Sequence, residues 1–370
     1  MNGPSAALES IARQFVPHAP VRAVDEYGSG NLNDTYLATF EGAAPVVLQR
    51  INTHVFKQPA QIMDNMRILS EHVQARLERE PLDRRWVVPR VYAAADGRDY
   101  YLDPQGGFWR AIGYVERSRC YQTVQSAGHA REAGLALGLF HYLISDLDPA
   151  RLHDTLPGFH VTPRYLAHYD RVRAGLAGGR PPRDEVRDGM QFVEQHRASA
   201  SVLEDALAAG KLRLRPIHGD PKINNFMIDE STGQAVSLID LDTVKPGLVH
   251  YDIGDCLRSC CNPAGEETTS FDEIRFDLDL CRVILEGYLS VAAGFLDAYD
   301  VAYLYECVFT IAFELGLRFF TDHLEGDVYF KVQHPQHNLH RALVQFRLAA
   351  SIKAQEAAIR EIVKGLIDDR

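Results

Sequence analysis

One run of eight residues near the middle of the chain constrains the fold more than any other segment. It reads His218, Gly219, Asp220, Pro221, Lys222, Ile223, Asn224 and Asn225. Apolar, strand-like stretches flank it at 216–217 and 226–228, so we expect a tight loop between two buried strands. Such a loop is an unfavourable place for so many polar side chains unless they are paired or have a function.

The polar residues of this run have the order and spacing that phosphoryl transfer requires. Lys222 follows Asp220 by two positions, and Asn225 follows it by five. Asp240 ends an apolar stretch fifteen residues beyond Asn225. A carboxylate can orient an attacking hydroxyl and accept its proton, an ammonium can hold the transferred group, and amide and carboxylate oxygens can ligate magnesium. We therefore predict Asp220 and Lys222 as catalytic residues, and Asn225 and Asp240 as ligands of Mg²⁺, in the order that protein kinases also use.

A hydrogen-bonded turn is the structural alternative for the run, because Asp-Pro is common at the start of turns. That alternative leaves the lysine, the asparagine and the downstream aspartate unexplained, so we favour the catalytic interpretation. Asp242 lies two residues beyond Asp240. It would either bind a second metal ion or cap the following turn, and the sequence does not decide between these roles.

The first third of the chain has the pattern of a β-sheet lobe. Short stretches rich in β-branched and aromatic residues predict strands at 21–24, 35–40, 45–51, 87–94, 99–102 and 108–115. Residues 58–79 have apolar side chains at helical spacing, and helical patterns dominate from about residue 124. We therefore predict an α+β, protein-kinase-like bilobal fold. A small antiparallel sheet would form a nucleotide-binding N-lobe of residues 1–116, and residues 117–370 would form a larger, mainly helical C-lobe with the catalytic and substrate residues.

Two glycines of the N-lobe are candidates for binding a nucleotide. Gly28 and Gly30 lie between the first two predicted strands. Because glycine has no Cβ atom, backbone amides at these positions could approach the phosphates closely. A plain β-turn explains two glycines alone equally well. The segment 113–116, after the last N-lobe strand, would offer backbone groups to adenine.

The third predicted strand lacks the lysine that usually pairs with the α- and β-phosphates. It offers Arg50, whose guanidinium can bind phosphate with two hydrogen bonds. Gln49 and Arg50 point to opposite faces of a strand, so only one of them can face the cleft, and we favour Arg50. Its expected helix partner is Asp64 or Glu71, although both carboxylates could simply be solvated.

The charge of the chain narrows the classes of partner. It contains 39 Lys and Arg residues against 50 Asp and Glu residues, which gives a formal net charge of −11. This argues against a nucleic-acid binder, because such proteins need a basic surface to displace counterions. We recognise no signal-peptide pattern and no apolar stretch long enough to span a bilayer. The six cysteines show no Cys-x-x-Cys spacing. We expect a cytoplasmic protein with reduced thiols and with neither nucleic acid nor a membrane as a partner.

Several further blocks carry a resemblance to a known family. Together with residues 218–225, the blocks at 28–36, 47–52, 239–244, 251–255, 318–322 and 327–330 resemble the aminoglycoside phosphotransferase/choline kinase superfamily, and within it the N-acetylhexosamine 1-kinase group. The resemblance implies ATP and Mg²⁺ as cofactors and a small-molecule sugar as the partner. The γ-phosphate would pass to the anomeric hydroxyl of N-acetylglucosamine or N-acetylgalactosamine, giving the sugar 1-phosphate.

The resemblance also implies roles for residues far from the central run. It favours Arg318 and Tyr329 as substrate-binding residues, whereas residue chemistry alone fits a helix end with an Arg318–Asp322 ion pair and a core tyrosine equally well. It favours a structural role for residues 251–255 with Arg258.

Two alternatives remain open on the sequence. The acceptor could be another small alcohol, such as an aminoglycoside, choline or homoserine. The acidic residues from Glu266 to Asp279 could attract a polycation, although such a run is more often a solvated face. The chain could also be a pseudokinase that only binds ligands, but the retained catalytic and metal residues argue against it.

Overall fold

The N-terminal part of the chain forms an antiparallel sheet. The computed structural model describes residues 4–28, 32–176 and 183–368. The strands are ordered β1-β2-β3-β6-β4, and β5 also pairs with β6. Their bounds are β1 Val21–Glu26, β2 Asp34–Phe40, β3 Val46–Arg50, β4 Val91–Tyr92, β5 Tyr101–Leu102 and β6 Phe108–Gly113, and the helices of this part are α1 Pro4–Phe15 and α2 Pro59–Arg79.

Strand alternation gives this sheet one face for a core and one for the cleft. Val46 and Leu48 of β3 are buried with Ala38 and Ala111 against Phe15 of α1. Side chains one position along each strand point the other way. Because β3 and β6 are paired with Gln49 opposite Arg110 and Val47 opposite Ile112, these four side chains lie on the face opposite α1.

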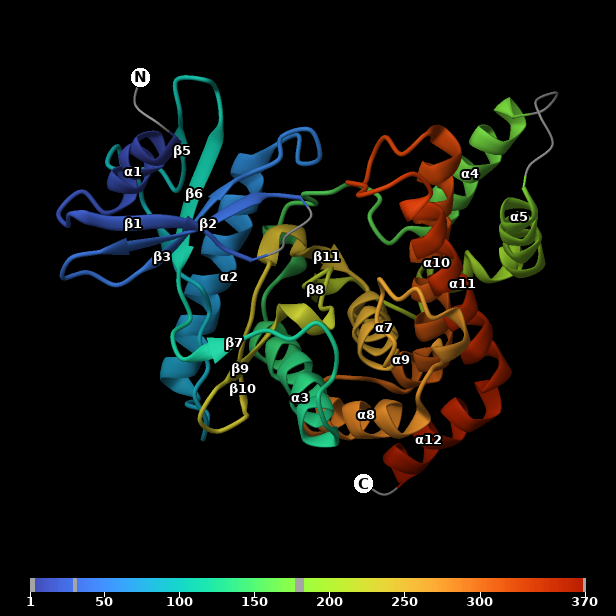
Figure 1. The fold of residues 1–370 in the computed structure, drawn as a ribbon. Coiled ribbons are helices and arrows are strands. Elements are labelled where there is room, and N and C mark those ends of the chain that lie inside the picture. Colours follow the sequence, from blue (N-terminus) through green and yellow to red (C-terminus); the bar gives the residue numbers. More distant parts are fainter. Residues whose placement is uncertain (1–3, 29–31, 177–182, 369–370) are drawn as a thin grey trace.

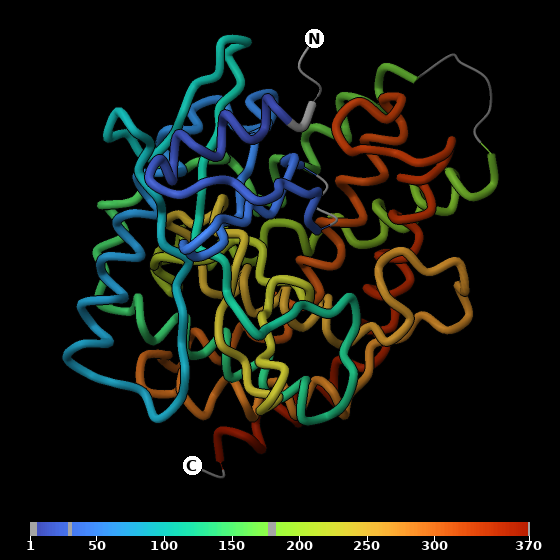
Figure 2. Tube along the Cα trace, turned by 60° about the vertical axis from the view of Figure 1, so that its left-hand side comes forward, coloured from blue at the N-terminus to red at the C-terminus, as the bar shows by residue number. Residues whose placement is uncertain are grey.

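The remaining chain is mainly helical. Its helices are α3 Ala127–Ile144, α4 Thr162–Gly175, α5 Asp184–His196, α6 Val202–Ala208, α7 Val249–Cys260, α8 Leu278–Ala292, α9 Ala298–Ala302, α10 Leu304–Glu325, α11 His337–Ala354 and α12 Glu356–Asp368. Its short strands are β7 Ser118–Arg119, β8 Arg215–Ile217, β9 Phe226–Asp229, β10 Ala235–Leu238 and β11 Lys245–Gly247. In Figure 1, β8 and β11 lie between the blue N-terminal sheet and the orange and red helices, and teal β7 lies beside yellow β9. Figure 2 shows the course of the chain from another side.

Glycines allow two of these helices to pack closely. A Cβ atom at Gly134 of α3 would collide with the backbone oxygen of Ile284, and one at Gly287 of α8 would collide with that of Arg131. Both helices carry many buried apolar side chains. The crossing therefore brings the two backbones into direct contact, and α3 also packs against β8 and β10.

The predicted fold class is confirmed: the chain has a kinase-like fold, with an antiparallel sheet in the N-lobe and a mostly helical C-lobe. The sheet of the N-lobe ends with β6 at Gly113, and β7 pairs with β9. A division at residue 116 lies between these strands and remains a prediction. No helix of the described residues is long and apolar enough to cross a membrane.

Candidate active site

A cleft of about 930 Å³ runs between the sheet and the helical part. Gly28, Val47, Gln49, Arg110 and Ile112 line it from the N-terminal side, and residues 113–115 line it at the connection. From the other side it is lined by Asp220, Lys222, Asn225 and Asp240. The structure therefore brings all four predicted catalytic and metal-binding residues to one cavity.

Hydrogen bonds to Asp252 of α7 hold the loop that precedes Asp220. The carboxylate of Asp252 accepts the backbone N–H groups of His218 at 2.7 Å and of Gly219 at 2.8 Å. Gly219 has φ +89°, and a Cβ atom there would lie 2.7 Å from the carbonyl oxygen of Thr243. Only glycine fits this close approach and backbone conformation. The predicted structural role of the 251–255 block agrees with these contacts.

His218 holds the loop through both ring nitrogens. Its Nε2 atom lies 2.9 Å from the carbonyl oxygen of Ile239, and its Nδ1 atom accepts the N–H of Asp220 at 3.2 Å. One nitrogen donates and the other accepts, so the ring is neutral. Burial, which is the largest influence, lowers the pKa of His218 in agreement with this state.

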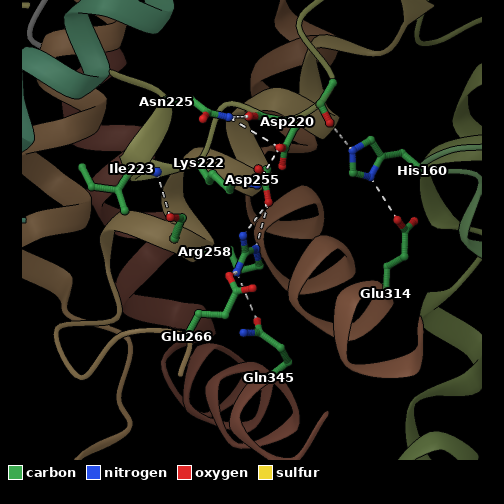
Figure 3. A network of polar contacts seen from close by, with 12 residues as sticks. His160, Asp220, Lys222, Ile223, Asn225, Asp255, Arg258, Glu266, Glu314 and Gln345 are labelled. Carbon is green, nitrogen blue, oxygen red and sulfur yellow. Dashed lines mark hydrogen bonds and ion pairs between the residues drawn. The ribbon is translucent and has the colours of Figure 1, made fainter. Parts of the chain in front are cut away.

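Asp220, Lys222 and Asn225 contact one another directly (Figure 3). The Nζ atom of Lys222 lies 2.8 Å from Oδ2 of Asp220. The Nδ2 atom of Asn225 donates to the backbone oxygen of Asp220 at 2.7 Å, which leaves its amide oxygen as the potential metal ligand. Burial alone would lower the pKa of Lys222, but the carboxylates of Asp220 and Asp240 raise it above its ordinary value. Lys222 is therefore a cation at neutral pH, beside the carboxylate that would accept a proton.

Asp240 is exposed to the cleft directly after β10 and Ile239. It adopts the left-handed conformation, with φ 68° and ψ 57°, which is uncommon for a residue with a side chain. Its pKa is raised to about 7, first because surrounding protein desolvates it and then because the carboxylates of Asp242 and Asp220 lie near. This concentration of negative charge would be relieved by a divalent cation.

The residues present fit a magnesium ion that is shared with a nucleotide. Within the described ranges, no group of three or more His, Cys, Asp or Glu side chains could hold a metal by itself. Mg²⁺ at phosphoryl-transfer sites takes one or two protein oxygens and completes its shell with phosphate oxygens and water. Asn225 and Asp240 can supply these two protein oxygens.

The structure does not bring Arg50 to the cleft. Its side chain is exposed on the face opposite Gln49, where it lies close enough to Asp103 to stabilise that carboxylate. Arg50 is absent from the described residues that line the cleft, whereas Gln49 is among them. Neither expected helix partner reaches Arg50, because Asp64 and Glu71 of α2 both pair with Arg67. Gly28 lines the cleft, and Gly30 lies outside the described residues.

Arg110 of β6, which the sequence analysis missed, is the basic residue of the N-terminal sheet that faces the cleft. It is 1% exposed, and its Nε and Nη2 atoms donate to Oε1 of Gln49 at 2.9 and 2.7 Å. Its Nη2 atom also lies 2.5 Å from Oδ1 of Asp242. Since Asn33 donates to the other oxygen of Asp242 at 2.8 Å, this aspartate is bound to the N-terminal sheet. The sequence feature that could have identified Arg110 is its position as a charged residue inside an otherwise apolar strand.

Arg318 and Tyr329 are not among the described residues that line the main cleft. The guanidinium of Arg318 lies over three rings, 4.9 Å from the centre of Phe159, 5.1 Å from Tyr165 and 5.5 Å from Phe330. It makes no hydrogen bond or ion pair with any residue of the described ranges. Burial would lower the pKa of Arg318, but Tyr165, Glu314, Tyr329 and Asp220 raise it. Arg318 is thus within electrostatic reach of the Asp220 carboxylate.

The alternative explanation, an Arg318–Asp322 ion pair at a helix end with Tyr329 as a core residue, does not match the geometry. Asp322 accepts the backbone N–H groups of residues 328, 329 and 330 at 2.8 to 3.0 Å and does not pair with Arg318. Tyr329 is 45% exposed, so it is not a core residue. Neither residue therefore has the environment that a helix-end ion pair and a core tyrosine require.

Carboxylates at the start of the acidic stretch are already neutralised. Glu266 lies 2.8 Å from Arg258. Glu267 lies 2.8 Å from His337 and 2.5 Å from Arg341. All of these side chains line the cleft. The cleft therefore offers a cationic ligand less free negative charge than the sequence suggests.

Comparison with known proteins places this geometry in a family. The model of the phosphotransferase enzyme family APH matches residues 24–305, which is more than half of the chain. The match includes the catalytic loop, Asp240 and Arg110.

Solved structures share the fold at low sequence identity. An aminoglycoside phosphotransferase from Alicyclobacillus acidocaldarius superposes with a TM-score of 0.63 at 16% identity, over 96% of each chain. A choline kinase from Cryptosporidium parvum gives a TM-score of 0.62 at 14% identity, over 98% of this chain and 99% of that one. An amicoumacin kinase in complex with AMP-PNP and Ca²⁺ gives 0.55 at 16% identity, over 98% of this chain and 94% of that one.

Proposed function

The chain belongs to the phosphotransferase enzyme family, and we propose that it is an ATP- and Mg²⁺-dependent kinase of an N-acetylhexosamine. The product would be the sugar 1-phosphate. The observation that carries the reaction type is the convergence of Asp220, Lys222, Asn225 and Asp240 on one cleft. With ATP as the donor, the cytoplasm is the expected compartment.

Each of these residues would have a separate role in the transfer. The anomeric oxygen attacks the γ-phosphorus, the bond from that phosphorus to the β–γ bridging oxygen breaks, and the hydroxyl proton passes to Asp220. Lys222 offsets charge on the transferred group. Asn225 and Asp240 would hold Mg²⁺, which neutralises the phosphate charge. The contact between Lys222 and Asp220 supports this assignment, because it places the ammonium group next to the carboxylate that would accept the proton.

Residues 1–116 would bind the nucleotide. Apolar side chains of Val47, Ile112 and Met227 line the cleft next to the connection at 113–115, which suits an adenine ring. Gly28, with φ +78° and open space around it, and Gly30 would lie against the phosphates. We assign the phosphate-binding cation to Arg110 in place of Arg50. The amicoumacin kinase complex with AMP-PNP supports an adenine nucleotide as the donor.

Arg318 and Tyr329 would bind the sugar. Arg318 lies over three aromatic rings and forms no ion pair with a carboxylate of the described residues, and rings together with a donor group are suited to the faces and hydroxyls of a sugar. The pairing of Glu266 and Glu267 with cations disfavours a polycationic aminoglycoside. The N-acetylhexosamine assignment itself rests on the resemblance of the N- and C-terminal blocks.

An acceptor panel with γ-labelled ATP and Mg²⁺ tests this proposal. It should include N-acetylglucosamine, N-acetylgalactosamine, glucose, an aminoglycoside, choline and homoserine. The matched control is the methyl glycoside of N-acetylglucosamine, which lacks the anomeric hydroxyl. We expect label in the two N-acetylhexosamines and none in the methyl glycoside. If only choline or an aminoglycoside became labelled, that compound would replace N-acetylhexosamine as the assigned substrate. If no acceptor became labelled, a pseudokinase would be favoured.

A further inference from the structure

A buried histidine outside the catalytic run contacts the loop that carries Asp220. His160 precedes α4, is 4% exposed and has φ +64°. A left-handed conformation is unfavourable for a residue with a side chain, so surrounding contacts must hold it there. Figure 3 shows its ring between Glu314 of α10 and the loop that ends in Asp220.

Both ring nitrogens of His160 face acceptors. The Nε2 atom lies 2.7 Å from the backbone oxygen of Gly219, and the Nδ1 atom lies 3.0 Å from Oε1 of Glu314. The other oxygen of Glu314 accepts the hydroxyl of Thr162 at 2.7 Å. A carbonyl and an ionised carboxylate cannot donate, so both nitrogens must carry protons. His160 is therefore an imidazolium, in contrast to the neutral ring of His218.

The contact to Gly219 fixes one particular peptide group. The carbonyl oxygen of Gly219 and the N–H of Asp220 belong to the same planar unit. His160 binds the oxygen at 2.7 Å, and His218 binds the N–H at 3.2 Å. Because the plane is held at both ends, it cannot rotate without moving the Cα atom of Asp220 and the carboxylate attached to it.

We propose that His160 is a positioning residue: the His160–Glu314 ion pair orients the Gly219–Asp220 peptide and thereby aims the Asp220 carboxylate at the acceptor hydroxyl. The inference rests on the proposed function for its chemical meaning. Tyr251 and Phe159 support the ring of His160, with centroids at 5.3 and 3.9 Å. The ring therefore has little freedom to move away from the loop.

The charges around the pair agree with this state. The titratable and charged groups that face it come from α4, α6, α7 and α10, and they are Tyr165, Glu204, Tyr251, Asp255, Glu314 and Arg318. Burial acts to lower the pKa of His160, but Glu314 and then Asp255 raise it above its ordinary value. Burial acts to raise the pKa of Glu314, but His160 and then Arg318 hold it below its ordinary range.

The direction of the pH dependence follows from these shifts. A histidine whose pKa is raised on folding contributes fully below its ordinary pKa of about 6.5. The contribution disappears as the pH rises through the higher folded value. Activity that depends on the pair should therefore decrease on the alkaline side.

The following variants distinguish an effect of the charges of His160 and Glu314 from an effect of side-chain packing. In His160→Gln, the side-chain nitrogen can still donate to Gly219, but the side-chain oxygen would face the carboxylate of Glu314. Glu314→Gln keeps the shape and removes the charge that stabilises the imidazolium. His129→Gln is the matched control, because His129 is also buried, but its Nδ1 atom accepts the N–H of Gln125 and it has no contact with the catalytic loop.

The first measurement needs no substrate. Two-bond ¹H–¹⁵N correlation spectra of histidine-labelled protein distinguish an imidazolium, with two protonated nitrogens, from a neutral ring. We expect the signal that is missing in His160→Gln to be an imidazolium at pH 7, and the amide resonance of Asp220 to titrate together with it. A neutral ring at pH 7, or an Asp220 resonance that does not follow it, would overturn the inference.

The second measurement is steady-state kinetics. His160→Gln should lower kcat roughly 10²-fold relative to His129→Gln, with KM for ATP unchanged, because a small misplacement of a reacting group has effects of this size. Glu314→Gln should move the alkaline limb of the kcat profile to lower pH. Equal kcat values for His160→Gln and His129→Gln would contradict the proposal. If no acceptor is phosphorylated, the proposed function fails and the spectra still decide the state of His160.

Discussion

Strand register decides which arginine of the N-terminal sheet can meet a nucleotide. Arg50 ends β3 on the face that packs against α1, and Arg110 of β6 pairs with Gln49 on the cleft face. Arg110 also holds Asp242, two residues beyond the proposed metal ligand. This ion pair joins the sheet to the segment that follows β10, so one guanidinium connects the proposed phosphate-binding side to the proposed metal-binding side.

Replacing Arg110 should weaken nucleotide binding far more than replacing Arg50. We expect Arg110→Met to raise KM for ATP roughly 10- to 100-fold, because hydrogen bonds to charged groups contribute about 1.5–3 kcal/mol each. Arg110→Met should also lower the free energy of unfolding, since Asp242 would be left buried without its partner. Steady-state kinetics and urea unfolding measure the two effects.

Arg50→Met is the matched control for this change, since it removes the same group from the neighbouring strand. We expect its KM for ATP to equal that of the wild type. The assignment would be wrong if Arg50→Met and Arg110→Met changed KM equally.

Glu204 should make the stability of the protein depend on pH. Its pKa is raised to about 7, chiefly by burial, although the hydroxyl of Tyr251 donates to it at 2.8 Å. Between about pH 4.3, where the unfolded side chain ionises, and pH 7, the folded state binds more protons than the unfolded state. Stability therefore decreases as the pH rises through this window.

Glu204→Gln keeps an acceptor for Tyr251 and removes the titration. We expect the melting temperature of the variant to fall less than that of the wild type between pH 5 and pH 8. Parallel melting curves for the two proteins would show that Glu204 titrates normally.

At the scale of elements, the crossing of α3 and α8 depends on glycines that no packing pattern in the sequence reveals. Gly287→Ala should destabilise the protein by about 1–3 kcal/mol, because its Cβ atom would meet the backbone of α3 at Arg131. The control is Gly365→Ala in α12, where the space around the Cβ position is open. That change should be neutral or stabilising by up to about 1 kcal/mol. Chemical unfolding of both variants decides the prediction, and equal effects would contradict it.

The elements of the N-lobe were largely predictable from local patterns, but two expected strands are shorter in the structure. The strand expected at 99–102 is reduced to β5, Tyr101–Leu102. The helix expected at 58–79 corresponds to α2, Pro59–Arg79. The strand expected at 87–94 is reduced to β4, Val91–Tyr92. Pro89 cannot donate to a strand ladder, and the N–H of Val87 instead donates to the backbone oxygen of Val236 in β10. The apolar residues were correctly recognised as part of a sheet-like segment, but Val87 pairs with a strand that is distant in the sequence.

For the whole molecule, the contiguous part of the site was predictable and the part assembled by folding was not. Asp220, Lys222 and Asn225 lie within six residues of one another, and their spacing carries the chemistry. The proposed roles of Arg110 and His160 depend on contacts to Asp242 and Gly219, which lie far away along the chain. The spacing of residues along the sequence does not predict such long-range contacts. The prediction that Arg50 faces the cleft was wrong. Strand alternation shows that neighbouring side chains point to opposite faces of the sheet, but it does not show which face is the cleft face.

The acceptor side also depends on the tertiary fold. Glu314 and Arg318 lie one turn apart on α10, so one helix provides both the partner of His160 and the proposed sugar ligand. The N-terminal sheet and this helix meet the catalytic loop from opposite sides (Figure 1). The proposed reaction therefore joins a nucleotide held by one lobe to an acceptor held by the other.

The transfer of labelled γ-phosphate from ATP to N-acetylglucosamine by wild-type protein and by Asp220→Asn tests the central claim most directly. Asn keeps the shape of the side chain and cannot accept the proton of the acceptor hydroxyl. The account predicts a sugar 1-phosphate from the wild type and a rate about 10²- to 10⁴-fold lower for the variant, with an unchanged melting temperature. Equal rates for the two proteins would contradict the account.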